Sequence, residues 1–93
     1  MKNLESLSKD QASGQAKEIF DTLESKMGMV PNVYATIGNS GPALQATLSI
    51  GETLRKGEFS GKEIEAIALA VGQANECGYC LAAHTAVGKS QGF

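Results

Sequence analysis

Apolar residues recur at steps of three and four along almost the whole chain, which is the period of an α-helix. The first such segment covers residues 10–27, follows a capping-box pattern between Ser8 and Gln11, and ends before Gly28. No alternating run of four or more residues is bounded by turn signals, so no strand is predicted. The pattern therefore predicts an all-α fold.

The later segments repeat this pattern, with one unusual member. Ser60 and Glu63 form a second capping-box pattern, and residues 64–71 behind it are apolar around nearly the whole helix, with Glu65 as the one charge. A helix of this kind is buried on several sides, in a core or in a subunit interface. Helices are expected over residues 33–37, 42–57, 60–75 and 76–91.

The length of the chain limits the size of its core. A chain of 93 residues is expected to form a single domain over residues 1–93, and a domain of this size buries only about 60% of its unfolded surface. Residues of the apolar class make up 42% of the chain and charged residues 19%, which argues against disorder. We therefore expect a helical bundle that is completed by association with other subunits.

Charge and hydropathy exclude several classes of partner. The net charge of −2 gives no basic surface for nucleic acid. The longest apolar run, residues 66–71, is far too short to cross a membrane, and no apolar stretch follows Lys2 as it would in a secretory signal. The expected location is the cytoplasm, where thiols are kept reduced and a close cysteine pair indicates redox or metal chemistry.

The only two cysteines and the only histidine lie within eight residues of one another. Cys77, Cys80 and His84 are separated by three and then four residues, which places them on one face of a helix. A thiolate is favoured at a helix N-terminus, and an imidazole one turn away can take the thiol proton. This arrangement suits a dithiol that is nucleophilic and then closes to a disulfide.

Glu65 is the expected fourth member of this group. If the chain turns at Asn75, Glu65 lies ten residues before the turn and His84 nine residues after it. In an antiparallel pair of helices both would then lie about 14 Å from the turn, at the same level. A carboxylate beside the imidazole would orient it and raise its basicity.

Two other interpretations of the same residues stay open. The two cysteines could be buried small residues without chemistry, or Cys77, Cys80 and His84 could form a three-ligand zinc site. Against zinc, all three ligands come from one helix and no second cluster of cysteine or histidine exists in the sequence. We therefore expect no metal and no cofactor.

The spacing of Glu65, Cys77, Cys80 and His84 resembles that of the alkyl hydroperoxidase D branch of the carboxymuconolactone decarboxylase-like family. The local sequence of residues 76–84 is similar to peroxidase-related members. The resemblance implies an all-helical bundle of the alkyl hydroperoxidase D-like type, assembled as a trimer or hexamer, with the CxxC pair at the N-terminal end of a helix.

The resemblance also implies a role for each residue. Cys80 would be the thiolate that attacks a peroxide, Cys77 the resolving thiol, and His84 with Glu65 the proton relay. The partners would be a peroxide substrate and an external dithiol or disulfide reductant. Some relatives have a second histidine where this chain has Tyr79, so that contribution to the relay is absent or replaced.

The resemblance leaves open both the extent of the domain and the function of the chain. It covers roughly residues 10–93 and includes residues 29–32. Domains of the family usually continue with further helices, so we expect a domain that either lacks its last helices or is completed by neighbouring chains. A thiol-dependent peroxidase or disulfide reductase is the expected function. The alternatives are a lyase like the decarboxylases that name the family, which act without a cysteine pair, and a non-catalytic oligomerisation or redox-sensing module.

Overall fold

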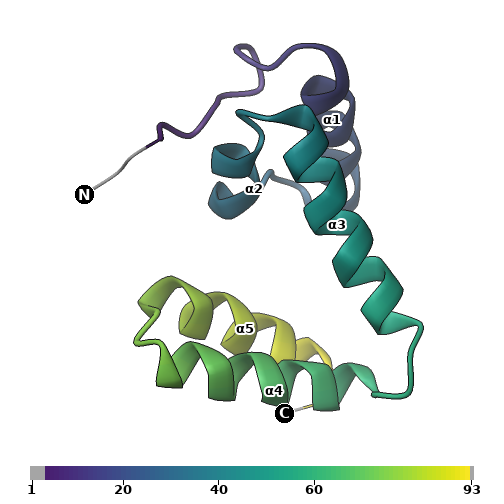
Figure 1. Ribbon diagram of the computed structural model, residues 1–93, viewed down its shortest axis with the longest axis vertical. Helices are drawn as coiled ribbons and strands as arrows, with labels where there is room; N and C mark the ends of the chain where they lie inside the picture. The colour runs from purple at the N-terminus through teal and green to yellow at the C-terminus, as the bar shows by residue number, and fades with distance from the viewer. Residues whose placement is uncertain (1–3, 93) are drawn as a thin grey trace. The chain divides into compact units, whose positions relative to one another are not determined.

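The computed structural model describes residues 4–92 and confirms the all-α prediction (Figure 1). The prediction that no secretory signal is present rests partly on residues 1–3, which lie outside this range. Residues 4–92 contain no strand, and none of their helices is long and apolar enough to span a membrane. Their five helices are α1 (Gly14–Met27), α2 (Asn32–Ile37), α3 (Gly41–Arg55), α4 (Gly61–Ala74) and α5 (Gly78–Ser90).

The helices form two compact units, one up to Ile50 and one from Gly51 onward. The prediction of a single domain over residues 1–93 stays a prediction. In the first unit, Phe20 and Leu44 are fully buried, and each such side chain contributes about 2 kcal/mol of apolar burial. Gly38 allows the Phe20 ring to come close, because a Cβ at this position would lie 2.6 Å from the ring.

The first helix begins later than its sequence pattern predicts. The Ser8 amide donates to Gln11 Oε1 at 2.9 Å and the Gln11 amide to Ser8 Oγ at 3.3 Å, so the reciprocal bonds of a capping box do form. They close a single turn, because Ser13 is extended and Gly14 is left-handed with a φ of 56°. The predicted start at residue 10 is therefore wrong, and α1 begins at Gly14.

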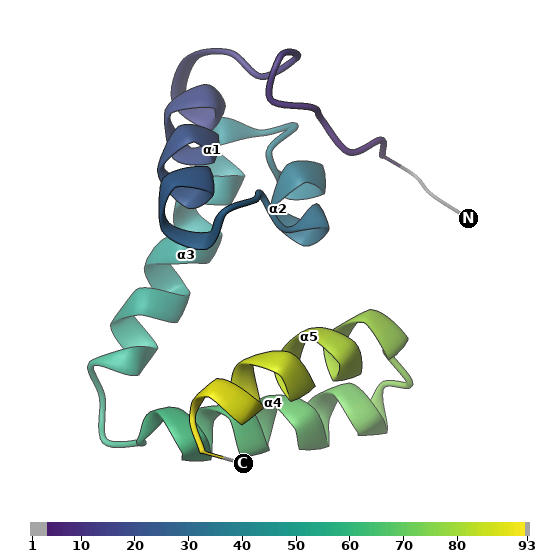
Figure 2. The ribbon, with the colours of Figure 1, turned by 180° about the vertical axis from the view of Figure 1, so that it is seen from behind.

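The second unit is built around the pair α4 and α5. Figures 1 and 2 show these two helices lying side by side and joined by a tight turn. The Cys77 amide donates to the Gly72 carbonyl at 2.9 Å, and Glu76 between them is left-handed with a φ of 54°. This is the Schellman arrangement that ends many helices, and it reverses the chain within three residues.

In α4 the charged side chain is buried and some apolar side chains are exposed, which is the reverse of what the sequence pattern predicts. Glu65, its one charge between residues 64 and 71, is fully buried, whereas Ile67 and Val71 are about half exposed, at 47% and 52%. Within the described chain α4 is thus not buried on several sides, because only one of its faces packs against α5. The alternative, burial in a subunit interface, stays a prediction.

The second capping box forms as predicted and begins α4 at Gly61. The Glu63 amide donates to Ser60 Oγ at 3.1 Å, and the Ser60 amide donates to Glu63 Oε1 at 2.9 Å. Ser60→Ala removes the first of these bonds, so we expect the free energy of unfolding to fall by about 1 kcal/mol in urea titrations. Ser13→Ala is the matched control, because Ser13 precedes α1 without a side-chain capping bond. Equal losses in both variants would contradict the assignment.

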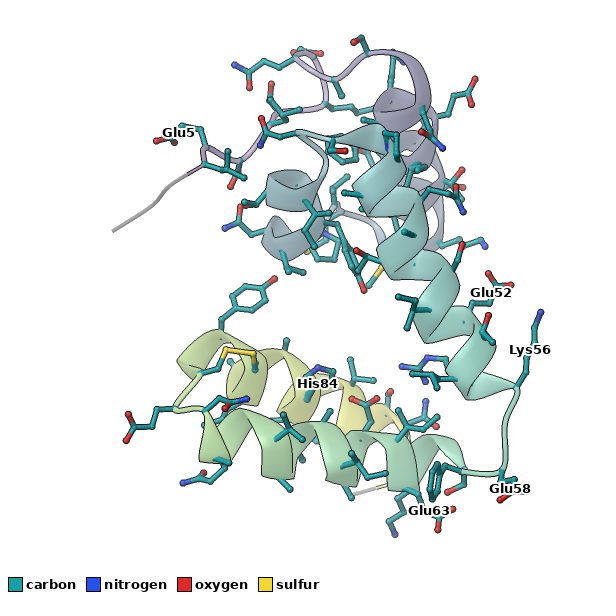
Figure 3. The ribbon with its side chains drawn as sticks, in the orientation of Figure 1. Glu5, Glu52, Lys56, Glu58, Glu63 and His84 are labelled. Atoms are coloured by element: carbon teal, nitrogen blue, oxygen red, sulfur yellow. A yellow bond between two sulfur atoms is a disulfide. The ribbon has the colours of Figure 1, made fainter. Side chains whose placement is uncertain are left out.

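The same capping box predicts a pH dependence. Hydrogen bonds from the Ser60 backbone and then its side chain lower the pKa of the Glu63 carboxyl from its ordinary value of 4.5. The stabilisation is therefore present above the ordinary value and is lost as the pH falls through the lowered one. Glu63→Gln cannot titrate, so the advantage of the parent protein over this variant should shrink between pH 7 and about pH 3. Glu58→Gln removes an exposed carboxylate outside the box and is the control (Figure 3); the same shrinkage there would refute the role of Glu63.

Candidate redox site

Cys77 and Cys80 are joined by a disulfide at the start of α5 (Figure 3). Their Cα atoms are 5.2 Å apart. Cys77 is the N-cap of α5, and its Sγ accepts a hydrogen bond from the Cys80 amide at 3.1 Å. The predicted CxxC pair thus lies at a helix N-terminus, where the Cys80 amide and the helix dipole favour a negatively charged sulfur once the bond is reduced.

Glu65 and His84 meet across the α4–α5 pair, as their spacing of ten and nine residues from the turn predicts. Glu65 Oε1 lies 2.7 Å from His84 Nδ1, although the residues are 19 apart in the sequence. The Glu65 side chain is fully buried and the His84 side chain is 38% exposed. The structure therefore brings the two residues together, while their role as a proton relay stays a prediction.

The Glu65 contact determines which atom of His84 can do chemistry. A carboxylate accepts hydrogen bonds, so it holds the proton of a neutral imidazole on Nδ1 and leaves the lone pair on Nε2. Cys80 precedes His84 by four residues on α5 and therefore lies one turn away on the same face. Of the two cysteines, Cys80 is the one that helical geometry places nearer to the imidazole.

Arg55 is a member of the site that the sequence analysis missed. It is the only arginine of the chain, and its Nη2 lies 3.3 Å from Glu65 Oε2. The side chain is 48% exposed, whereas the carboxylate that it contacts is fully buried. One signal in the sequence could have found it: the sole arginine precedes a helix whose apolar segment, residues 64–71, carries a single charge. The spacing of residues around the α4–α5 turn places Glu65 beside His84, but it carries no information on the connection that brings the end of α3 to α4.

The sequence model of the carboxymuconolactone decarboxylase family matches residues 42–93. This stretch is more than half of the chain. The chain belongs to the carboxymuconolactone decarboxylase family. No curated protein and no solved structure matches it. The match contains Arg55, Glu65, Cys77, Cys80 and His84, so the whole candidate site lies in the part that defines membership of the family.

In this member of the family, the described residues hold no group of three or more histidine, cysteine, aspartate or glutamate side chains placed to bind a metal. Tyr79, which lies between the two cysteines in the sequence, is 48% exposed. The site therefore contains two groups of contacting residues. One is the cysteine pair, and the other is a carboxylate between an imidazole and a guanidinium.

Gly72 sets how closely α4 approaches the disulfide. A Cβ at this position would lie 3.2 Å from the Cβ of Cys80 and 3.7 Å from a methyl group of Leu81. The first distance is shorter than an ordinary van der Waals contact, so a larger residue would push α5 away from α4 near Cys80. The absence of a side chain at Gly72 is therefore part of the site in this family member.

We expect Gly72→Ala to be less favourable than an otherwise similar substitution. In a helix interior, glycine to alanine is worth up to about 1 kcal/mol of stabilisation. Gly51→Ala in α3 should show this gain, since nothing lies within 4 Å of its Cβ. Gly72→Ala should lose the gain or reverse it because of the contact with Cys80. Urea unfolding of both variants in the disulfide form measures the difference, and equal stabilisation would show that α4 does not need a glycine here.

Proposed function

We propose that the chain is a thiol-dependent peroxidase or disulfide reductase that works through Cys77 and Cys80. The observation that carries the proposal is the disulfide at the start of α5, with a histidine one turn away whose Nδ1 contacts a buried carboxylate. Two cysteines close enough to form a disulfide, with a base one helical turn away, are what such a cycle uses.

The oxidising half of the proposed cycle uses both sulfurs. His84 Nε2 takes the proton of the Cys80 thiol, and the thiolate attacks the terminal oxygen of a hydroperoxide. The O–O bond breaks, an S–O bond forms, and the leaving alkoxide takes a proton and departs as an alcohol. The Cys77 thiol then attacks the sulfur of the sulfenic acid and closes the disulfide. The displaced hydroxide takes the proton of the Cys77 thiol and leaves as water. Two electrons pass from sulfur to the peroxide.

The reducing half returns the pair to the dithiol. An external dithiol attacks one sulfur of the disulfide and forms a mixed disulfide, and its second thiol then releases the reduced protein and leaves oxidised itself. Two electrons and two protons are transferred to Cys77 and Cys80. With a disulfide as substrate in place of the peroxide, the same pair would run the exchange in the other direction.

The assignment of roles to the two cysteines has separate support for each. Cys80 is one helical turn from His84, which suits the thiol that must lose a proton to attack. Cys77 Sγ accepts the Cys80 amide, which stabilises negative charge on the sulfur that would leave during reduction by the external dithiol. Cys80 as the attacking thiolate and Cys77 as the resolving thiol therefore fit these contacts.

The proposal includes the assembly and location of the protein. Ile67 and Val71 on α4 expose apolar surface that association with further copies would bury. A homo-oligomer is therefore part of the proposed function, and we expect a trimer or hexamer as the family resemblance implies. A cytoplasmic location, where conditions are reducing, is also part of the proposal.

Peroxide consumption with a dithiol reductant tests the chemistry. The parent protein should consume many equivalents of hydrogen peroxide or an organic hydroperoxide, and Cys80→Ser should lose roughly 100-fold or more of the rate. When the external dithiol is left out, Cys77→Ser should consume about one equivalent for each chain and stop as a sulfenic acid, because the chain has no second thiol to resolve it. Ala82→Ser adds a hydroxyl to the same helix at an exposed position and should retain the parent rate.

The outcomes separate the proposal from its alternatives. Thiols that titrate unchanged after peroxide treatment, in a protein whose oligomers stay intact, would leave a non-catalytic module. If Cys80→Ser consumed peroxide at the parent rate, another group would have to attack the peroxide. Stoichiometric zinc in the purified protein would indicate a metal site and contradict the redox site.

A further inference from the structure

The Glu65 carboxylate has a different partner on each of its oxygens. Oε1 lies 2.7 Å from His84 Nδ1, and Oε2 lies 3.3 Å from Arg55 Nη2. Both partners are the single residue of their type in the sequence, and the carboxylate between them is fully buried. The hydrogen bond to His84 is therefore only half of the environment of Glu65.

The charge of a buried carboxylate has to be balanced nearby, since an unpaired charge away from water is costly. If His84 were the sole partner, the balance would require a positively charged imidazole, and a histidine that stays protonated cannot take the proton of a thiol. A guanidinium is protonated throughout the working range of proteins. Arg55 can therefore supply the positive charge permanently, so that His84 is not required to do so.

We propose that Arg55 is a positioning residue that neutralises Glu65 and thereby leaves His84 free to change its protonation state during the thiol cycle. This inference rests on the proposed function for its catalytic consequence, but the charge balance itself does not. Arg55 also holds Oε2, which fixes the carboxylate so that Oε1 faces Nδ1 and the lone pair stays on Nε2. In the presence of Arg55, the site can hold a neutral imidazole beside an ionised carboxylate.

The other charged groups around the site are occupied or exposed. Lys56, which directly follows α3, pairs with Glu52 on α3 at 3.7 Å, and both side chains are more than 70% exposed. On α4, Glu63 is bound in the capping box at the start of the helix. Lys62 on α4 and Lys89 on α5 are exposed, and the two cysteines form the disulfide. Within the described part of the chain, the side chain of Glu65 contacts Arg55 and His84.

Proton NMR can observe the effect directly, because the single histidine gives one set of imidazole ring signals. Arg55→Gln removes the permanent cation and should move the midpoint of the ring titration to higher pH, since Glu65 then favours the charged imidazole. Arg55→Lys restores a cation and should bring the midpoint back toward that of the parent. Lys56→Gln is the matched control: it removes the same charge from the next residue without contact to Glu65, and should leave the midpoint unchanged.

The rate of peroxide consumption should follow the ring titration. In Arg55→Gln, the low-pH side of the profile should move to higher pH, with a rate at pH 7 lowered by roughly threefold to tenfold that recovers as the pH is raised. A residue with only a structural role would lower the rate at all pH values. If Arg55→Gln does not fold, Arg55→Met keeps the aliphatic stem and provides a second variant without the charge.

A charge-free variant at residue 55 whose ring midpoint equals that of the parent overturns the proposal, and so does an equal upward shift in Lys56→Gln. The double variant Arg55→Gln with Glu65→Gln adds a further check, because Arg55→Gln should raise the midpoint less in the Glu65→Gln background than in the parent. If the parent protein consumes no peroxide but the ring midpoint moves as expected, the proposed function fails and the role of Arg55 stands. If peroxide is consumed and the midpoint does not move, the reverse holds.

Discussion

The second unit is organised around one buried negative charge. Glu65 lies on the face of α4 that the apolar residues would be expected to occupy, and it connects the last residue of α3 with the middle of α5. Burial of a carboxylate is tolerated only when its oxygens have partners, and here each oxygen has one. Glu65 thus constrains where α3 ends, how α4 is rotated and which side of the imidazole is occupied.

This constraint explains why apolar side chains of α4 face outward. With Glu65 and Gly72 turned toward α5, residues such as Ile67 and Val71 on other faces cannot also be covered by a single neighbouring helix. The site and the exposed surface are therefore two results of the same rotation of α4. A helix that turns its buried face to a polar contact buries less apolar area of its own.

Much of the fold could be predicted from local signals. The Ser60–Glu63 capping box began a helix because its bonds are made within four residues, and the Glu65–His84 contact followed from counting residues on either side of one turn. The start of α1 was predicted wrongly, because the identical pattern at Ser8–Gln11 closes a turn that Ser13 and Gly14 then interrupt. Arg55 was missed because its place depends on the connection between α3 and α4, which carries no periodic signal.

The position of Cys77 links chemistry to local folding. One sulfur atom both forms half of the disulfide and accepts a hydrogen bond from the Cys80 amide in the first turn of α5. A thiolate is a better acceptor than a disulfide sulfur, and a protonated thiol is a weak one. The first turn of α5 is therefore held with a different strength in each state of the pair. We therefore expect amide hydrogen exchange at Cys80 to differ between the oxidised and the reduced protein.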